Sequence, residues 1–106
     1  MAQLGIVIVS YNTRDLLRQC LASVEASLAR SQLDAEVVVV ENASSDGSAE
    51  MVRQRFPWAR LVANRRNSGF AAASNQGLRA LGLPGEAPPY AMLLNPDTIV
   101  RGSALA

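Results

Sequence analysis

Residues 4–9 read LGIVIV, a short run of apolar and mostly β-branched side chains. A run without polar alternation is typical of a strand that is covered on both faces, as in a parallel sheet. Residues Ala35–Glu41, AEVVVVE, repeat this pattern, and Tyr90–Leu94 form another apolar run that predicts a buried strand. Arg60–Ala63 form a weaker one. We therefore expect four strands in one mostly parallel sheet.

Helical patterns separate these four runs. Apolar residues recur at three- and four-residue spacing after the first run, and shorter helical patterns follow residue 48 and span residues 70–81. Strands that alternate with helices predict an α/β fold with three layers, helices on both faces of the sheet and right-handed crossovers. The expected inner faces are Leu17, Cys20, Leu21, Val24 and Leu28, then Met51, Val52 and Phe56, then Phe70, Ala73, Leu78 and Leu81.

Length and composition limit the class of protein. The 106 residues suffice for one domain, and 49% hydrophobic against 18% charged residues indicates a globular chain. A net charge of +1 gives no reason to expect a nucleic-acid partner. The chain has no histidine, which excludes a Ser-His-Asp triad, and its single cysteine excludes an internal disulfide. No run approaches a membrane span of about 18 residues.

Polar loops follow every predicted strand, at the edge where open α/β sheets bind ligands. They are residues 10–13, 41–47, 64–69 and 95–98. The first three lead into helix N-termini, which favour anions such as phosphate, and their amide and acid groups suit a base or a ribose. A nucleotide is therefore the expected ligand. The dinucleotide motif G-x-G-x-x-G does not follow the first strand, and the G-x-x-x-x-G-K-[ST] motif needs a lysine that the chain lacks.

Four motifs in these loops resemble, in their order, the N-terminal part of family 2 glycosyltransferases, especially rhamnosyltransferase-like members. They are VIVSYN at 7–12, VVENASSDGS at 39–48, RNSGFAAASN at 66–75 and LLNPDT at 93–98. The resemblance covers essentially the whole chain. It implies the A-type glycosyltransferase fold, with residues 1–106 as a C-terminally truncated donor-binding part. It also implies inverting sugar transfer from a nucleoside-diphosphate sugar, assisted by Mg²⁺ or Mn²⁺.

Asp97 is the metal-binding residue that the resemblance implies. It matches the last acid of the family's D-x-D motif, and a hard divalent cation prefers carboxylate oxygens. Pro96 stiffens the turn that presents this carboxylate. Asn95 stands where many relatives carry an aspartate, and we place it among the donor-binding residues. The alternative role for Asp97 is that of an acid that only closes its own β-turn.

The other donor-binding residues come from the first three loops. Glu41 matches an aspartate that accepts a hydrogen bond from the base, which favours a UDP- or dTDP-sugar; the alternative is a solvated strand-end acid. Asp46 is expected to cap or brace a helix more often than to touch the donor. Arg66 is a candidate for paired hydrogen bonds to phosphate. The full donor-binding set is Ser10, Tyr11, Asn12, Glu41, Asp46, Arg66, Asn67, Gly69 and Asn95.

Some of these residues also have structural interpretations. Asn12 or Thr13 can cap the first helix, and Gly69 permits a close backbone approach. Cys20 lies on the apolar stripe of that helix and is expected in the core. Asn75 is expected to brace the loop of the fourth strand.

No residue matches the general base of the family, so no catalytic residue is assigned. The resemblance implies an acceptor glycan or lipid-linked glycan, and a bacterial cytoplasmic enzyme of cell-surface polysaccharide synthesis at the inner face of the membrane. A nucleotidyltransferase would need a glycine-rich basic loop after the first strand, and residues 10–15 argue against it. A non-catalytic module that binds a nucleotide or a partner remains the open alternative.

Overall fold

The computed structural model describes residues 4–32, 34–82 and 90–97. β1 (Leu4–Ser10), β2 (Ala35–Glu41), β3 (Arg60–Ala63) and β4 (Tyr90–Leu94) form a parallel sheet in the order β3-β2-β1-β4. The helices α1 (Arg14–Ser31), α2 (Ser48–Arg55) and α3 (Phe70–Ala80) alternate with these strands. The predicted order of strands and helices is confirmed.

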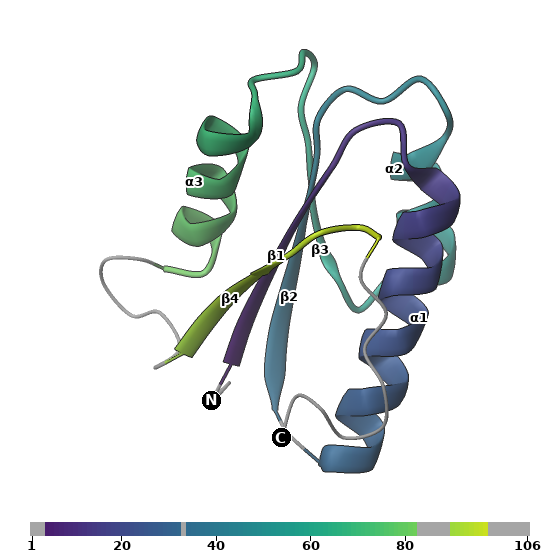
Figure 1. The fold of residues 1–106 in the computed structure, drawn as a ribbon, viewed down its shortest axis with the longest axis vertical. Helices are drawn as coiled ribbons and strands as arrows, with labels where there is room; N and C mark the ends of the chain where they lie inside the picture. Colours follow the sequence, from purple (N-terminus) through teal and green to yellow (C-terminus); the bar gives the residue numbers. More distant parts are fainter. Residues whose placement is uncertain (1–3, 33, 83–89, 98–106) are drawn as a thin grey trace.

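Helices cover both faces of the sheet. α1 and α2 lie on one face and α3 lies on the other (Figure 1). Ile6 and Ile8 of β1 are fully buried against α1, whereas Val7 between them is fully buried on the side of α3. Because successive side chains of a strand point to opposite faces, a strand covered on both sides needs an unbroken apolar run. The three-layer architecture predicted from the alternation of strands and helices is therefore confirmed.

α3 approaches the sheet closely at Gly77. A Cβ atom at this position would collide with Val7, and it would lie 3.3 Å from Cγ2 of Val40. The buried residues of α3 are correspondingly small, namely Ala73, Ser74 and Gly77. This close packing fixes the position of α3 against β1 and β2.

Two expectations about apolar residues are wrong. Phe70 is 59% exposed, because it is the first residue of α3 and lies outside the small-residue face that packs on the sheet. β4 is not a buried strand: Tyr90 is 73% exposed and Leu93 is 46% exposed. Within the described ranges β4 pairs only with β1, so it is an edge strand there.

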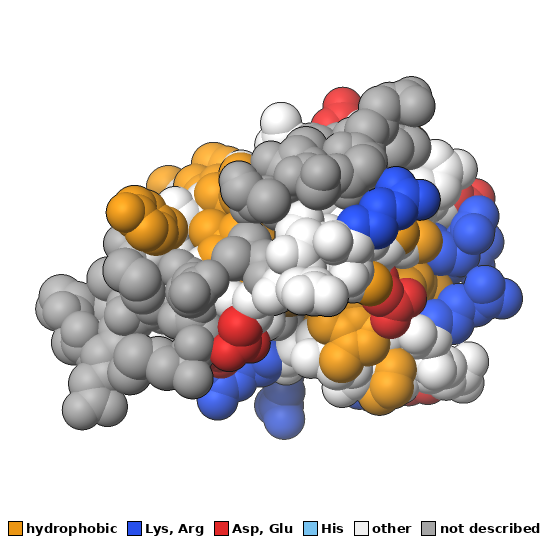
Figure 2. Space-filling view, turned by 90° about the horizontal axis from the view of Figure 1, so that it is seen from below, with side chains coloured by type: hydrophobic (Ala, Val, Ile, Leu, Met, Phe, Trp, Pro, Cys, Tyr) orange, Lys and Arg blue, Asp and Glu red, His pale blue; other side chains and the backbone are white. Residues whose placement is uncertain are grey.

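The polar loops mark one end of the molecule. The loops after β1, β2 and β3 lie together, and the turn after β4 curves towards α1 (Figure 1). The opposite end carries hydrophobic, arginine and acidic side chains interspersed on its surface (Figure 2). β1 has β2 on one side and β4 on the other, so the chain reverses its strand order between β1 and β4. Ligands of open α/β sheets bind at such a point. No helix in the described ranges has the length and apolar character needed to cross a membrane.

Candidate functional site

The loops after β1 and β2 are joined through Asn12. Its backbone N–H donates to Oγ of Ser44 at 2.7 Å, and its Oδ1 accepts from the backbone N–H of Ser45 at 2.9 Å. Asn12 has a left-handed backbone with φ of 52°, which asparagine adopts more readily than most residues. These two bonds hold Asn12 in that conformation, so its side chain shapes the loop.

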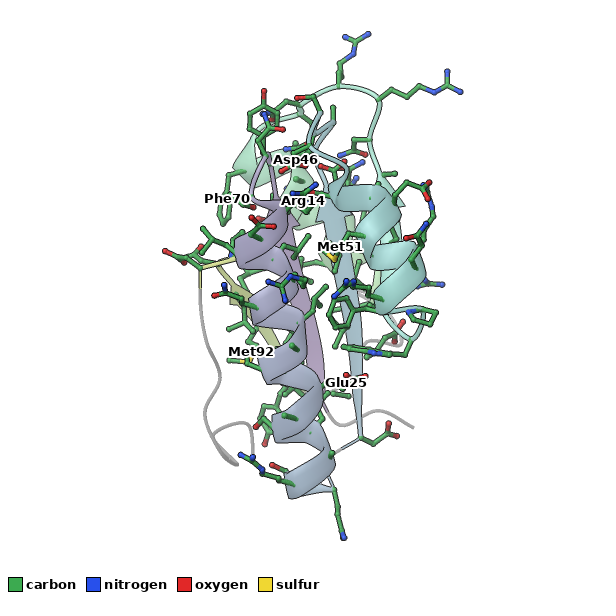
Figure 3. The ribbon with its side chains drawn as sticks, turned by 90° about the vertical axis from the view of Figure 1, so that its right-hand side faces the viewer. Arg14, Glu25, Asp46, Met51, Phe70 and Met92 are labelled. Atoms are coloured by element: carbon green, nitrogen blue, oxygen red, sulfur yellow. The ribbon has the colours of Figure 1, made fainter. Side chains whose placement is uncertain are left out.

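The Asp46 carboxylate serves the N-termini of two helices. Its Oδ2 accepts from the backbone N–H of Arg14 at 2.9 Å, at the start of α1. Its Oδ1 accepts from the backbone N–H of Ser48 at 3.1 Å and from Oγ of Ser48 at 2.6 Å, at the start of α2. The guanidinium of Arg14 donates in return to the carbonyl oxygen of Asp46 at 3.0 Å (Figure 3). Asp46 therefore braces two helices, the role that its sequence context favours.

The charge of Asp46 suits this position. Burial opposes ionisation, but the hydrogen bonds from the Ser48 hydroxyl and from the backbone of Arg14 and Ser48 outweigh it, and the pKa of Asp46 lies below its ordinary value. Helix N-termini also favour a negative charge. The carboxylate is thus ionised where two sets of free N–H groups converge.

Capping of α1 by Asn12 or Thr13 is not what the structure shows. Thr13 occupies the N-cap position, but its hydroxyl makes no capping bond and lies 2.8 Å from Oγ of Ser10. The Arg14 N–H binds Asp46 instead, 32 residues further along the chain. Ser10 itself is fully buried. The side chains of Ser10 and Thr13 therefore pack the loop internally, while Tyr11 between them is 50% exposed.

Glu41 lies at the end of β2 and is only 3% exposed. Its Oε1 accepts from the backbone N–H of Ser44 at 2.8 Å and closes the turn after the strand. The alternative interpretation as a solvated strand-end acid is therefore wrong. A carboxylate has acceptor capacity for further hydrogen bonds beyond this one.

A network of neutral amides holds the loop after β3. Asn42 is 2% exposed, and its Nδ2 donates to Oδ1 of Asn67 at 2.9 Å. Asn64 and Gln76 exchange two side-chain hydrogen bonds of 2.8 and 3.0 Å. Sequence reasoning did not single out Asn42, Asn64 or Gln76. The only signal was the position of Asn42, a polar residue directly after the acid that ends a buried strand.

The predicted residues of this loop divide into two kinds. Oδ1 of Asn67 also accepts from the backbone N–H of Gly69 at 2.8 Å, and Gly69 has a φ of 83°, which glycine adopts at little cost. Arg66 is exposed and has no hydrogen bond or ion pair with any residue that the structure describes. Asn67 and Gly69 thus shape the loop, and the guanidinium of Arg66 is available to a ligand.

The turn after β4 lies against α1. The thiol of Cys20 donates weakly to the carbonyl oxygen of Asn95, with 3.8 Å between Sγ and O. Burial, and then the nearby carboxylate of Asp97, raise the pKa of Cys20 to about 11. Asp97 is exposed at the mouth of an open hollow of about 280 Å³. The hollow is lined by Thr13, Leu16, Asn95, Pro96 and Asp97.

This hollow joins two of the predicted loops at the point where strand order reverses. Thr13 and Leu16 also line a second hollow of about 310 Å³, together with Asn12, Arg14, Asp15 and Asp46. The turn that carries Asp97 and the loop that carries Tyr11 therefore border one continuous surface. Asn75 is exposed on α3 and makes no hydrogen bond with residues 95–97, the described part of the turn after β4.

The residues at this turn fit a divalent cation that takes most of its ligands from elsewhere. The described part of the chain contains no group of three or more Cys, Asp or Glu side chains that would hold a metal on its own. Asp97 offers one hard carboxylate, and Asn95 adds an amide beside it. Mg²⁺ is commonly bound by one or two carboxylates together with substrate phosphates and water. These oxygen ligands thus suit a metal that arrives already bound to a diphosphate.

Comparison with known sequences identifies relatives of this chain. The sequence profile of Glycosyl transferase family 2 matches residues 5–105. An N-acetylglucosaminyl-diphospho-decaprenol L-rhamnosyltransferase of Mycobacterium tuberculosis is 30% identical over 100 residues, which are 89% of this chain and 32% of the relative. The succinoglycan biosynthesis protein ExoO of Rhizobium meliloti is 35% identical over 75 residues, which are 70% of this chain and 21% of ExoO. The chain thus spans a third or less of these relatives.

Solved structures have the same fold. The mannosyltransferase PcManGT from Pyrobaculum calidifontis, in complex with GDP-Man and Mn²⁺, superimposes with a TM-score of 0.76 at 25% identity, over 95% of this chain and 29% of that one. S. aureus TarS 1–349 in complex with UDP-GlcNAc gives a TM-score of 0.73 at 22% identity, over 99% of this chain and 29% of TarS. The expected A-type glycosyltransferase fold is therefore confirmed.

Proposed function

Because the chain belongs to glycosyl transferase family 2, we propose that it is the donor-binding part of an enzyme that transfers a sugar from a nucleoside-diphosphate sugar to an acceptor hydroxyl. The strongest support is the position of Asp97. Its exposed carboxylate shares a hollow with the start of α1, beside the reversal of strand order between β1 and β4. A hard oxygen ligand at this place suits a metal-bound diphosphate.

The base of the donor would lie over the loops after β1 and β2. Tyr11 projects a half-exposed ring there, and the buried carboxylate of Glu41 would accept the imide N–H of uracil or thymine. We therefore propose a UDP- or dTDP-sugar as donor. Asn12 and Asp46 would act by holding these loops, since their side-chain oxygens are already bonded to loop and helix N–H groups.

The diphosphate would lie between Arg66 and Asp97. A guanidinium forms paired hydrogen bonds with phosphate oxygens, and Asp97 would hold Mg²⁺ or Mn²⁺ beside the donor-binding residue Asn95. When bound, the metal would neutralise the charge that develops on the departing nucleoside diphosphate. We propose a single displacement with inversion, in which the acceptor hydroxyl attacks the anomeric carbon opposite the diphosphate. None of the residues assigned here supplies the general base for that hydroxyl.

The names of the relatives support a proposal for the acceptor class. The Mycobacterium tuberculosis relative is named as a rhamnosyltransferase on a diphospho-decaprenol acceptor, and ExoO is named for succinoglycan biosynthesis. We propose a glycan or lipid-linked glycan as acceptor, and therefore an enzyme that works at the inner face of a bacterial membrane in polysaccharide synthesis.

Calorimetric titration tests the proposal. UDP and dTDP are titrated into the protein and into Asp97→Ala, with and without Mn²⁺. We expect binding that requires Mn²⁺ and that the variant loses. Binding that neither Mn²⁺ nor Asp97 affects would support a non-catalytic nucleotide-binding module instead. An absence of binding to the folded protein with Mn²⁺ would contradict a donor site built from these residues.

A further inference from the structure

We infer that Asn42 is a positioning residue, whose buried amide holds residues 64–69 in the shape that presents Arg66 to the donor diphosphate. The inference rests on the proposed function for the role of Arg66. It concerns a residue that contacts no ligand in this scheme, because Asn42 is 2% exposed and its side-chain donors and acceptors are all bonded within the loop after β3.

The side-chain hydrogen bonds of Asn42 all go to this one loop. Nδ2 donates to Oδ1 of Asn67 at 2.9 Å and to the carbonyl oxygen of Gly69 at 3.4 Å. Oδ1 accepts from the backbone N–H of Ser68 at 3.0 Å, from Oγ of Ser68 at 3.1 Å and from Nδ2 of Asn64 at 3.1 Å. Both amide hydrogens and both lone pairs are therefore used.

Asn42 itself is anchored to the sheet. Its backbone N–H donates to the carbonyl oxygen of Ser10 at 2.8 Å, which ties it to the end of β1. The first residue of the loop is anchored as well, because the backbone N–H of Asn64 donates to the carbonyl oxygen of Glu41 at 2.9 Å. Asn64 is also paired with Gln76 on α3, and Gly77 packs α3 closely onto the sheet.

The segment between these anchors depends on Asn42. Asn67, Ser68 and Gly69 contact its amide directly, whereas Arg65 and Arg66 are exposed and do not bond to it. Without the amide, the arginines would be attached to a segment that is fixed only at its ends. A guanidinium on such a segment would lose entropy when it orders around a phosphate, which weakens binding.

The chemistry of the network requires an amide rather than a carboxylate. Aspartate has nearly the same shape as asparagine but no N–H donor. Asn42→Asp would place a carboxylate oxygen against Oδ1 of Asn67 and the carbonyl oxygen of Gly69, and acceptors that face each other repel. Asn42→Asp therefore tests the hydrogen bonds at almost constant volume, and Asn42→Ala tests removal of the whole group.

Limited trypsin digestion measures the loop independently of any nucleotide. Trypsin cleaves after arginine, and Arg65 and Arg66 provide sites inside the loop. We expect Asn42→Asp and Asn42→Ala to raise cleavage after these two residues about tenfold, with little change after Arg79 on α3. Gln19→Ala, which removes an exposed amide from α1, is the matched control. Digestion is carried out well below the melting temperature of each variant.

A double-mutant cycle then connects the loop to the donor. Affinity for UDP with Mn²⁺ is measured for Asn42→Asp, for Arg66→Ala and for the double variant. We expect Asn42→Asp to weaken UDP binding about tenfold in the parent protein and much less in the Arg66→Ala background, because both changes remove the same interaction.

Two results would overturn the inference. One is unchanged cleavage after Arg65 and Arg66 in folded Asn42 variants. The other is an equal loss of UDP affinity from Asn42→Asp with and without Arg66, which is what a general loss of fold stability would cause. Failure of the proposed function is recognised separately, because Asp97→Ala and Arg66→Ala would then leave UDP binding unchanged while the digestion still reports on Asn42.

Discussion

The first three loops of the site and the turn after β4 lie on the same edge of the sheet but are held in different ways. Asp46 binds the N-termini of α1 and α2 with bonds of 2.6 to 3.1 Å, and Asn42 fills its hydrogen-bonding capacity within the loop after β3. The turn that carries Asp97 instead follows an edge strand and meets α1 through a thiol contact of 3.8 Å. The polar residues of the motifs thus include a frame, whose side chains hold loops and helices together, and exposed residues that we propose face the ligand.

The distinction predicts different consequences for mutation. Asn12, Asp46 and Asn42 form the frame, so their loss should lower stability or loosen a loop. Arg66 and Asp97 are exposed, so their loss should weaken ligand binding and leave the fold intact. A frame residue whose substitution affected only binding, or an exposed residue whose substitution affected only folding, would contradict this division.

The largest expected effect is on metal-dependent binding. Asp97→Ala should weaken UDP binding in the presence of Mn²⁺ by more than about 100-fold, because it removes the carboxylate that we propose as the metal ligand. Its melting temperature should stay within about 1 °C of the parent. Calorimetry and thermal melting measure the two quantities, and Glu25→Ala, an exposed acid on α1, is the control (Figure 3). A large loss of stability would assign Asp97 to the frame.

The next effect is on the free energy of unfolding. Asp46→Ala should lower it by about 2 kcal/mol, since one carboxylate caps two helices and each cap contributes about 1 kcal/mol. Chemical denaturation at pH 7 measures this change. Asp15→Ala, which removes an exposed acid from the first turn of α1, should change stability far less.

The pH dependence of the free energy of unfolding tests whether Asp46 stabilises the fold through its charge. Its pKa in the folded protein is below the ordinary value of 3.8, so the stability contributed by its charge is present above that value and is lost as pH falls through the folded pKa. The difference in stability between the parent and Asp46→Asn should therefore shrink below about pH 4. A difference that stays constant down to the pH of acid unfolding would contradict a role for the charge.

Much of the fold could be predicted from the sequence, but the hydrogen bonds between its loops could not. The buried strands and the apolar stripe of α1 were predictable because burial on both sides leaves a run or a period in the residues. The bond from Asp46 to Arg14 spans 32 residues, and the bond from Asn42 to Asn67 spans 25. Contacts of this kind depend on which loops the topology brings together, and no local pattern encodes them. Exposure of Tyr90 likewise depends on the position of β4 in the sheet, not on its apolar sequence.

A smaller effect is expected for the ligand-facing arginine. Arg66→Ala should weaken UDP binding about tenfold through the loss of the proposed charge-assisted hydrogen bonds to phosphate, without a change in melting temperature. Arg65→Ala is the natural control, because the two arginines are neighbours on the same exposed loop. Equal losses from both substitutions would indicate general electrostatic attraction of the nucleotide instead of a specific contact.

The smallest effect at neutral pH concerns the thiol beneath the turn that carries Asp97. Folding raises the pKa of Cys20 from 9.0 to about 11, through burial and the Asp97 carboxylate. The unfolded chain therefore loses its thiol proton first, and the free energy of unfolding should fall as pH rises from about 9 to about 11. Cys20→Ala should make this decline shallower by at most about 1.4 kcal/mol per pH unit.

Denaturation curves of metal-free protein between pH 8 and pH 11 measure this decline, because below pH 8 both states keep the thiol protonated. Asp97→Ala separates the two causes. The variant removes the carboxylate that repels the thiolate but leaves Cys20 buried, so the decline should persist and end at a lower pH than in the parent. An identical pH profile in Asp97→Ala would mean that burial alone sets the pKa of Cys20. Water around the exposed carboxylate of Asp97 would then screen its charge from the thiol.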